Sequence, residues 1–132
     1  MFFRSDLYIV ITKGGDGIST PAAYRRLDEH YSCAFPSDDM RFNAALSAVG
    51  SADIEAVAAH MYNSFEAVVL SEHSEAAEAR ERLLSYGARA AMLSGSGPAV
   101  FGIFDTESAA ESAAARLRLI GYDAAACRSA HR

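Results

Sequence analysis

A five-residue loop of small side chains, Ser94–Pro98, carries the pattern in this sequence that most directly suggests chemistry. Short apolar runs flank it on both sides, over residues 90–93 and 99–104. Glycine permits positive φ angles and a close approach of backbone to ligand. Successive N–H groups in such a loop can form a concave nest for an anion. The alternative is an ordinary hairpin turn. The candidate anion-binding residues are Ser94, Gly95, Ser96 and Gly97.

A second candidate site is the segment Gly17–Tyr24, which combines a hydroxyl with an aromatic ring. Thr20 and Pro21 are typical of a helix start, because threonine can cap and proline suits the first helical position. Tyr24 follows four residues later and shares a helix face with Thr20. A helix N-terminus with a hydroxyl suits a polar or anionic ligand, and the tyrosine ring could stack on a base. The alternative is a plain N-cap beside a core aromatic.

Size, composition and charge limit the class of protein. The chain has 132 residues, of which 51% are hydrophobic, so it fits one domain, residues 1–132, with a real core. The formal net charge is −5 and no run of Lys or Arg occurs, which argues against nucleic acid as a partner. No apolar run approaches the roughly 18 residues that a membrane-spanning helix needs, so we expect no membrane partner.

The cysteines and the N-terminus indicate the compartment. Cys33 and Cys127 are far apart in an acidic, alanine-rich chain, a usage typical of reduced, cytosolic proteins; a disulfide is the minor alternative. The first residues lack a charged region followed by a long apolar stretch, so we expect no signal peptide. We expect a cytoplasmic location.

The order of elements predicts the fold class. Strands are expected at Leu7–Thr12, Arg89–Leu93, Ala99–Phe104 and Tyr122–Cys127, and helices at about 20–31, 40–49, 53–71, 74–86 and 105–120. With the middle helices treated as one insertion, this is the βαββαβ order of a ferredoxin-like α+β sandwich with additional helices. If the hairpin of the second and third strands lies beside the first strand, both candidate loops open on one edge of the sheet.

Several common catalytic patterns are absent from the sequence. The four histidines show no metal-ligand spacing, and neither cysteine belongs to a Cys-x-x-Cys pair, so we expect no metal site. The carboxylates Glu72, Glu75, Glu78 and Glu81 lie at helical spacing with Arg80 and Arg82 among them, as on a solvated helix face. Neither a P-loop nor a Gly-x-Ser-x-Gly elbow occurs, so the sequence supports neither a P-loop NTPase nor a serine hydrolase.

Three motifs in order resemble the C-terminal half of the GHMP kinases. They are Gly17-Ile-Ser-Thr20 with Tyr24, Asn63-Ser-Phe-Glu66, and Gly87-Ala followed by Met92-Leu-Ser-Gly-Ser-Gly-Pro-Ala-Val-Phe-Gly102. The glycine loop marks the superfamily. The Gly-Ile-Ser-Thr segment with its aromatic is similar to one branch, the 4-diphosphocytidyl-2-C-methyl-D-erythritol kinases. The resemblance covers nearly the whole chain.

The resemblance implies an activity and a set of site residues. This branch transfers the ATP γ-phosphate to a cytidine-diphosphate methylerythritol in non-mevalonate isoprenoid synthesis, with ATP and Mg²⁺ as the cofactors of the full-length enzyme. By this resemblance Thr20 and Tyr24 bind the cytidine-containing substrate, with the ring of Tyr24 packed on cytosine. The loop of Ser94, Gly95, Ser96 and Gly97 lies near the nucleotide phosphates and the reacting end of the substrate.

The departures from the family concern the catalytic parts. The family's ATP loop, Pro-x-x-x-Gly-Leu-Gly-Ser-Ser, does not occur in the chain, and the catalytic aspartate and lysine belong to the N-terminal half. Gly14 replaces a proline that usually follows the lysine at position 13. We therefore expect no catalytic residue here, no cofactor for this chain alone, and an N-terminal GHMP domain as its partner.

Two further expectations concern assembly and a rival function. Without the N-terminal domain, this domain leaves exposed the surface that an interdomain contact would bury. We expect this face near the Gly17–Tyr24 and Ser94–Pro98 loops, and weak self-association through it as a two-fold homodimer. The alternative is a monomer whose loops cover the face or stay mobile. The alternative function is a stand-alone ferredoxin-like module that binds a small molecule or regulates another protein.

Overall fold

The structure is a computed structural model that describes residues 7–13, 19–31, 39–51 and 53–129. The strands are β1 (Tyr8–Lys13), β2 (Ala90–Leu93), β3 (Ala99–Phe104) and β4 (Ala124–Arg128). The helices are α1 (Thr20–Tyr31), α2 (Asp39–Ser51), α3 (Ile54–His60), α4 (Glu66–Glu72), α5 (Ser74–Ser85) and α6 (Glu107–Leu119). Within these residues, no helix has both the length and the apolar character needed to cross a membrane.

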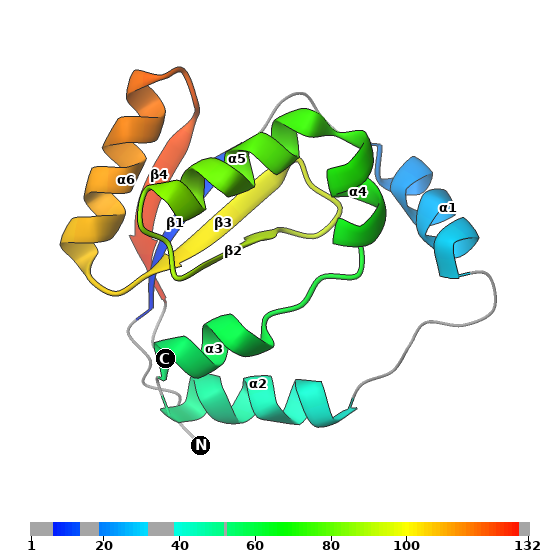
Figure 1. Ribbon diagram of the computed structural model, residues 1–132, viewed down its shortest axis with the longest axis horizontal. Coiled ribbons are helices and arrows are strands. Elements are labelled where there is room, and N and C mark those ends of the chain that lie inside the picture. The colour runs from blue at the N-terminus through cyan, green and yellow to red at the C-terminus, as the bar shows by residue number, and fades with distance from the viewer. Residues whose placement is uncertain (1–6, 14–18, 32–38, 52, 130–132) are drawn as a thin grey trace.

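The four strands form one antiparallel sheet in the order β2-β3-β1-β4. In this order the first and third strands are neighbours at the centre, as in a ferredoxin-like sheet. Helix α5 crosses from β1 to β2, and α6 crosses from β3 to β4. Helices α1 to α4 form the insertion between β1 and α5 (Figure 1). The predicted α+β class and the βαββαβ order with additional helices are therefore confirmed.

One face of the sheet makes the main core. Val10, Val100 and Phe104 point from β1 and β3 toward this core, where Leu83 of α5 and Leu117 of α6 are also fully buried. Alternation along the strands produces this arrangement, since successive side chains point to opposite faces. Figure 1 shows α5 in front of β2 and β3, and α6 beside β4. This packed layer is the rigid support from which the β2–β3 loop extends.

The opposite face of the sheet is covered by the α2–α3 pair. Ile103 of β3 is buried there against Ala48 and Val57. Figure 1 shows α2 and α3 side by side, away from α5 and α6. Helix α2 continues through Gly50 to Ser51, two residues beyond its predicted end. The Ser51 hydroxyl donates to the backbone carbonyls of Ser47 and Ala48 in the last turn.

The long helix predicted over 53–71 is wrong, because the structure has two helices there. Helix α3 ends at His60 and α4 begins at Glu66. In between, the side chain of Asn63 accepts a hydrogen bond from the N–H of Phe65 at 2.9 Å and donates to carbonyls beyond its own segment. An asparagine that offers local backbone such a partner competes with helix. The interruption brings residues 61–65 to the glycine loop.

Some predicted features lie outside the described residues. These are most of the loop after β1, including Gly14, Gly17 and Ile18, and the irregular segment that contains Cys33. The other cysteine, Cys127, is exposed and not in a disulfide.

Candidate functional site

The glycine loop turns tightly between β2 and β3. Gly95 and Gly97 adopt positive φ angles of 57° and 82°, which residues with a Cβ rarely adopt. The N–H of Ser94 donates to Ala99 O at 2.8 Å, and the N–H of Gly97 donates to Ser94 O at 3.0 Å. Among the described residues, the N–H groups of Gly95 and Ser96 have no hydrogen-bond acceptor. The turn therefore presents two adjacent donors, as an anion-binding nest requires.

The start of α1 lies against this turn. The hydroxyl oxygens of Thr20 and Ser96 are 3.2 Å apart, within hydrogen-bond distance. Thr20 is not the helix cap that its sequence context predicts. Ser19 takes that place, and its Oγ accepts from the N–H of Ala22 at 3.3 Å. Because Ser19 caps α1, the hydroxyl of Thr20 is available for the loop, and the two predicted motifs meet in space.

Tyr24 is a surface aromatic and not part of the core. Its side chain is 53% exposed, which excludes the alternative of a buried ring. Its ring meets Phe65 edge to face, with centroids 5.0 Å apart and planes at 80°. Such pairs fix the orientation of both rings. Phe65 therefore supports Tyr24 from one side and leaves much of its surface accessible.

A pocket of about 490 Å³ joins Tyr24 to the glycine loop. Its apolar walls include Leu27, Phe65, Met92 and Phe101 beside Tyr24, and the loop contributes Ser94 and Gly95. Ligand pockets commonly have volumes of roughly 300–1,000 Å³ and combine apolar walls with a few polar groups. Thr20, Ser96 and Gly97 do not line this pocket. Of the predicted residues, Tyr24, Ser94 and Gly95 line the pocket, whereas Thr20 and Ser96 contact each other outside its lining.

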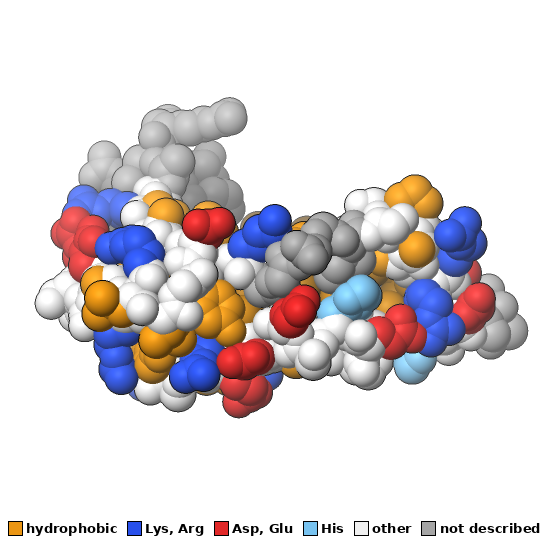
Figure 2. Space-filling model, turned by 90° about the horizontal axis from the view of Figure 1, so that it is seen from above, with side chains coloured by type: hydrophobic (Ala, Val, Ile, Leu, Met, Phe, Trp, Pro, Cys, Tyr) orange, Lys and Arg blue, Asp and Glu red, His pale blue; other side chains and the backbone are white. Residues whose placement is uncertain are grey.

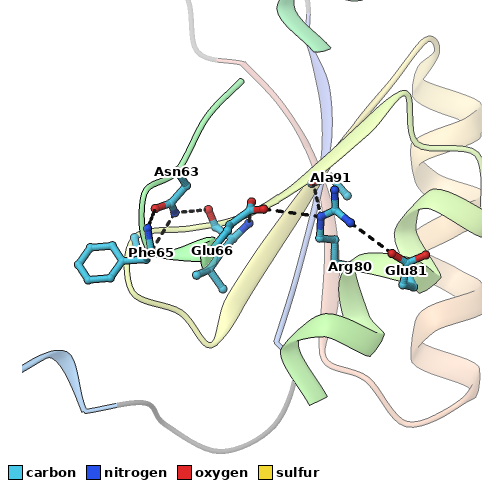
Figure 3. A network of polar contacts seen from close by, with 8 residues as sticks. Asn63, Phe65, Glu66, Arg80, Glu81 and Ala91 are labelled. Atoms are coloured by element: carbon cyan, nitrogen blue, oxygen red, sulfur yellow. Dashed lines mark hydrogen bonds and ion pairs between the residues drawn. The ribbon is translucent and has the colours of Figure 1, made fainter. Parts of the chain in front are cut away.

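Three polar side chains that the sequence prediction did not assign a role lie along the outer edge of β2 (Figure 3). Asn63 donates to Leu93 O at 2.7 Å, and Glu66 Oε1 accepts from the N–H of Leu93 at 3.0 Å. Arg80 Nε donates to Ala91 O at 3.1 Å. An edge strand exposes unpaired backbone groups, and covering them blocks pairing with another strand. In the sequence, the signal that could identify these edge-covering residues is the polar pair Asn63 and Glu66 within an apolar stretch.

The charged groups form surface pairs and no catalytic cluster among the described residues. Arg26 binds Glu72 through Nε at 2.7 Å and Glu29 at 2.6 Å. The hydrogen bond from Arg26 lowers the pKa of Glu72. Within the described part of the chain, no three His, Cys, Asp or Glu side chains are grouped as metal ligands.

Acidic and basic side chains alternate over the face shown in Figure 2. They do not gather there into one basic patch, in keeping with the net charge of −5. A nucleic-acid-binding surface usually carries a basic patch or stripe, and the face in Figure 2 carries neither.

Known proteins match this chain along most of its length. A family model described as GHMP kinases C terminal matches residues 45–123. The 4-diphosphocytidyl-2-C-methyl-D-erythritol kinase of Acaryochloris marina is 34% identical over 122 residues, covering 85% of this chain and 39% of that protein. The enzyme of the same name from Gloeobacter violaceus is 38% identical over 112 residues, covering 84% of this chain and 37% of that protein.

A solved structure agrees with these relatives. The crystal structure of a 4-(cytidine 5′-diphospho)-2C-methyl-D-erythritol kinase matches with a TM-score of 0.75 and 28% identity. The match covers 93% of this chain and 42% of that one. This chain thus spans about two fifths of the length of the proteins it matches. The family match extends over more than half of its residues, so the chain belongs to the GHMP kinase C-terminal family.

Proposed function

We propose that this chain is the C-terminal, substrate-side domain of a kinase that transfers the ATP γ-phosphate to 4-diphosphocytidyl-2-C-methyl-D-erythritol. The observation that carries the proposal is the pocket lined by Tyr24 and by Ser94 and Gly95 of the glycine loop, where the N–H of Gly95 has no acceptor among the described residues. An aromatic wall suits a base, and a nest suits phosphate. The relatives that carry this kinase name support the choice of substrate.

The proposed division of labour leaves the chemistry to a second domain. Phosphoryl transfer depends on positioning and on charge stabilisation by phosphate loops, Mg²⁺ and a placed base. This chain supplies the base wall and the nest. Its described residues offer no carboxylate cluster for Mg²⁺, so no step of the proposal runs through a metal held here. ATP and Mg²⁺ belong in this scheme to an N-terminal GHMP domain.

Binding of cytidine diphosphate to the 132-residue chain tests the proposal. We expect saturable binding that shifts the Tyr24 ring signals in NMR spectra. Stacking on one base contributes about 1–3 kcal/mol, so Tyr24→Ala should weaken binding about 5- to 150-fold. The matched variant Tyr24→Phe keeps the ring and should bind within twofold of the wild type.

Two results would contradict the proposal. One is binding of cytidine diphosphate that Tyr24→Ala leaves unchanged. The other is a Tyr24 ring that responds to an amino acid or another small effector and not to cytidine nucleotides. That second result would favour the rival function, a stand-alone regulatory module.

A further inference from the structure

Asn63 is tied to the glycine loop by its side-chain amide. Its Nδ2 donates to Gly95 O at 2.9 Å as well as to Leu93 O at 2.7 Å. Leu93 ends β2, and Gly95 follows it at the turn of the loop. The two bonds therefore span the junction where the strand becomes the loop.

Only an amide satisfies every partner of this side chain. The two carbonyls need a donor, and the N–H of Phe65 needs the acceptor that Asn63 Oδ1 provides at 2.9 Å. An aspartate has nearly the same shape, but ionised it only accepts. It would keep the Phe65 contact and set a negative oxygen against two carbonyl oxygens. The site thus selects asparagine by its hydrogen-bonding pattern and not by size.

The same short segment also supports the aromatic wall. Phe65 lies two residues after Asn63, and its ring packs edge to face on Tyr24. The side chain of Asn63 accepts from the N–H of Phe65 and donates to the carbonyl of Gly95, so it fixes both the backbone of Phe65 and the loop. Residues 63–65 therefore connect the two halves of the pocket within one segment.

We propose that Asn63 is a positioning residue that holds the glycine loop at a set distance from Tyr24. A ligand with both a base and a diphosphate then reaches both at once. This inference rests on the proposed function, because it assumes that the wall binds a base and the loop binds phosphate. It predicts that Asn63 determines how much the diphosphate adds to the binding of cytidine.

The test compares cytidine diphosphate with cytidine on Asn63→Asp and the wild type. We expect the wild type to bind the diphosphate at least tenfold more tightly than the nucleoside. Asn63→Asp should reduce that preference to less than twofold and change cytidine binding by less than about twofold. Asn43→Asp, at an exposed position of α2, makes the same charge change and should keep the preference. Should Asn63→Asp not fold, Asn63→Ala removes the same two donors without adding a charge.

Amide exchange in the ligand-free chain gives an independent readout. The Gly97 N–H donates to Ser94 O and does not contact Asn63. We expect its exchange to be at least fivefold faster in Asn63→Asp. The Tyr122 N–H, which donates to Leu117 O after α6, should exchange at the wild-type rate.

The outcomes separate this inference from the proposed function. If Asn63→Asp keeps the diphosphate preference, or weakens both ligands equally, the positioning role is wrong and the proposed function stands. If the wild type shows no diphosphate preference, the proposed function fails. Amide exchange then decides the positioning role, and unchanged Gly97 exchange in Asn63→Asp would overturn it.

Discussion

The hydroxyl oxygens of Thr20 and Ser96 lie 3.2 Å apart, although 76 positions of sequence separate them. The contact joins the first turn of α1 to the glycine loop. Both hydroxyls belong to residues that the sequence singled out for a ligand site. The structure shows them bonded to each other, and Thr20 contacts the loop without lining the pocket.

Replacing Thr20 by valine removes that hydroxyl and keeps the shape of the side chain. Thr20 is exposed, so losing its bond to Ser96 should lower the free energy of unfolding by no more than about 0.5–1.5 kcal/mol. A hydrogen bond that holds the loop contributes about 0.5–1.5 kcal/mol, so cytidine diphosphate should bind about 2- to 13-fold more weakly. Calorimetric titration and thermal unfolding measure the two quantities.

Thr106→Val is the matched control for this prediction. Thr106 caps α6 by accepting from the N–H of Ala109 at 3.0 Å. Its loss should cost about 1 kcal/mol of stability without an effect on ligand affinity. If Thr20→Val also lowered stability without an effect on ligand affinity, the hydroxyl would stabilise the fold without positioning the loop for the ligand.

Glu66 is expected to contribute to stability through the edge of β2. Its Oε1 accepts from the N–H of Leu93, and its Oε2 lies 3.9 Å from Arg80 Nε. Glu66→Ala leaves that N–H without its acceptor and should cost about 1–3 kcal/mol. Glu66→Gln keeps an acceptor and should cost less.

Urea unfolding of Glu66→Ala and Glu66→Gln checks whether the alanine variant loses more stability than the glutamine variant. Glu81→Ala serves as a control, because Glu81 is exposed and pairs with the same arginine at 3.2 Å. A surface pair of this kind contributes little. A Glu81 effect as large as that of Glu66 would show that the ion pairs of Arg80, and not the strand edge, determine the loss.

The elements that the sequence predicted well are those with local signals. Short, continuous apolar runs predict β1 and β3, and glycine after a helix predicts the end of α5, where Gly87 has a φ of 106°. The break at Asn63 has no comparable signal. Apart from Asn63 and Ser64, residues 53–71 have largely helical composition, and the carbonyls that bind Asn63 lie 30 and 32 positions away. A local reading therefore favoured one helix where tertiary partners produce two.

The capping of α1 illustrates the same limit on a smaller scale. Ser19 and Thr20 are both good caps by residue type. The choice between them depends on Ser96, which occupies the hydroxyl of the second. Sequence could therefore identify Thr20 as a residue of the site but could not predict its partner.

The Arg26–Glu72 pair predicts a pH dependence of stability. The hydrogen bond from Arg26 lowers the pKa of Glu72 in the folded chain. The carboxylate therefore stabilises the fold at pH values above the glutamate value of the unfolded chain, about 4.3. This contribution is lost as pH falls below that value and through the lowered pKa. Glu72→Gln should have a lower Tm than the wild type at pH 7, and the difference should shrink toward pH 3.

Glu111→Gln controls for the loss of any surface carboxylate, since Glu111 is exposed on α6. Because Glu72 is also exposed, the effect at pH 7 should be small and sensitive to salt. A Tm difference between Glu72→Gln and the wild type that stays constant from pH 7 to pH 3 would contradict the prediction.

The division of labour between domains predicts the kinetics. With ATP and Mg²⁺, the 132-residue chain alone should form no phosphorylated product from 4-diphosphocytidyl-2-C-methyl-D-erythritol. Joined to the N-terminal part of the Acaryochloris marina relative, it should support turnover. In that chimera Tyr24→Ala should raise KM more than it lowers kcat, because stacking is shared by ground and transition states. Turnover by the chain alone, or a pure kcat defect, would contradict this.

Gly102 tests how closely β3 packs on the end of α5. A Cβ at this position would lie 3.0 Å from Cβ of Ala88 and 3.4 Å from Cβ of Leu83. Neither neighbour is the flexible end of a long side chain, so Gly102→Ala should overpack the core and cost about 1–3 kcal/mol. The double variant Gly102→Ala with Ala88→Gly removes the closer contact and should recover part of the loss relative to additive single effects. Thermal unfolding of the four proteins completes the cycle, and strict additivity would show that the contact with Ala88 does not exclude a side chain at position 102.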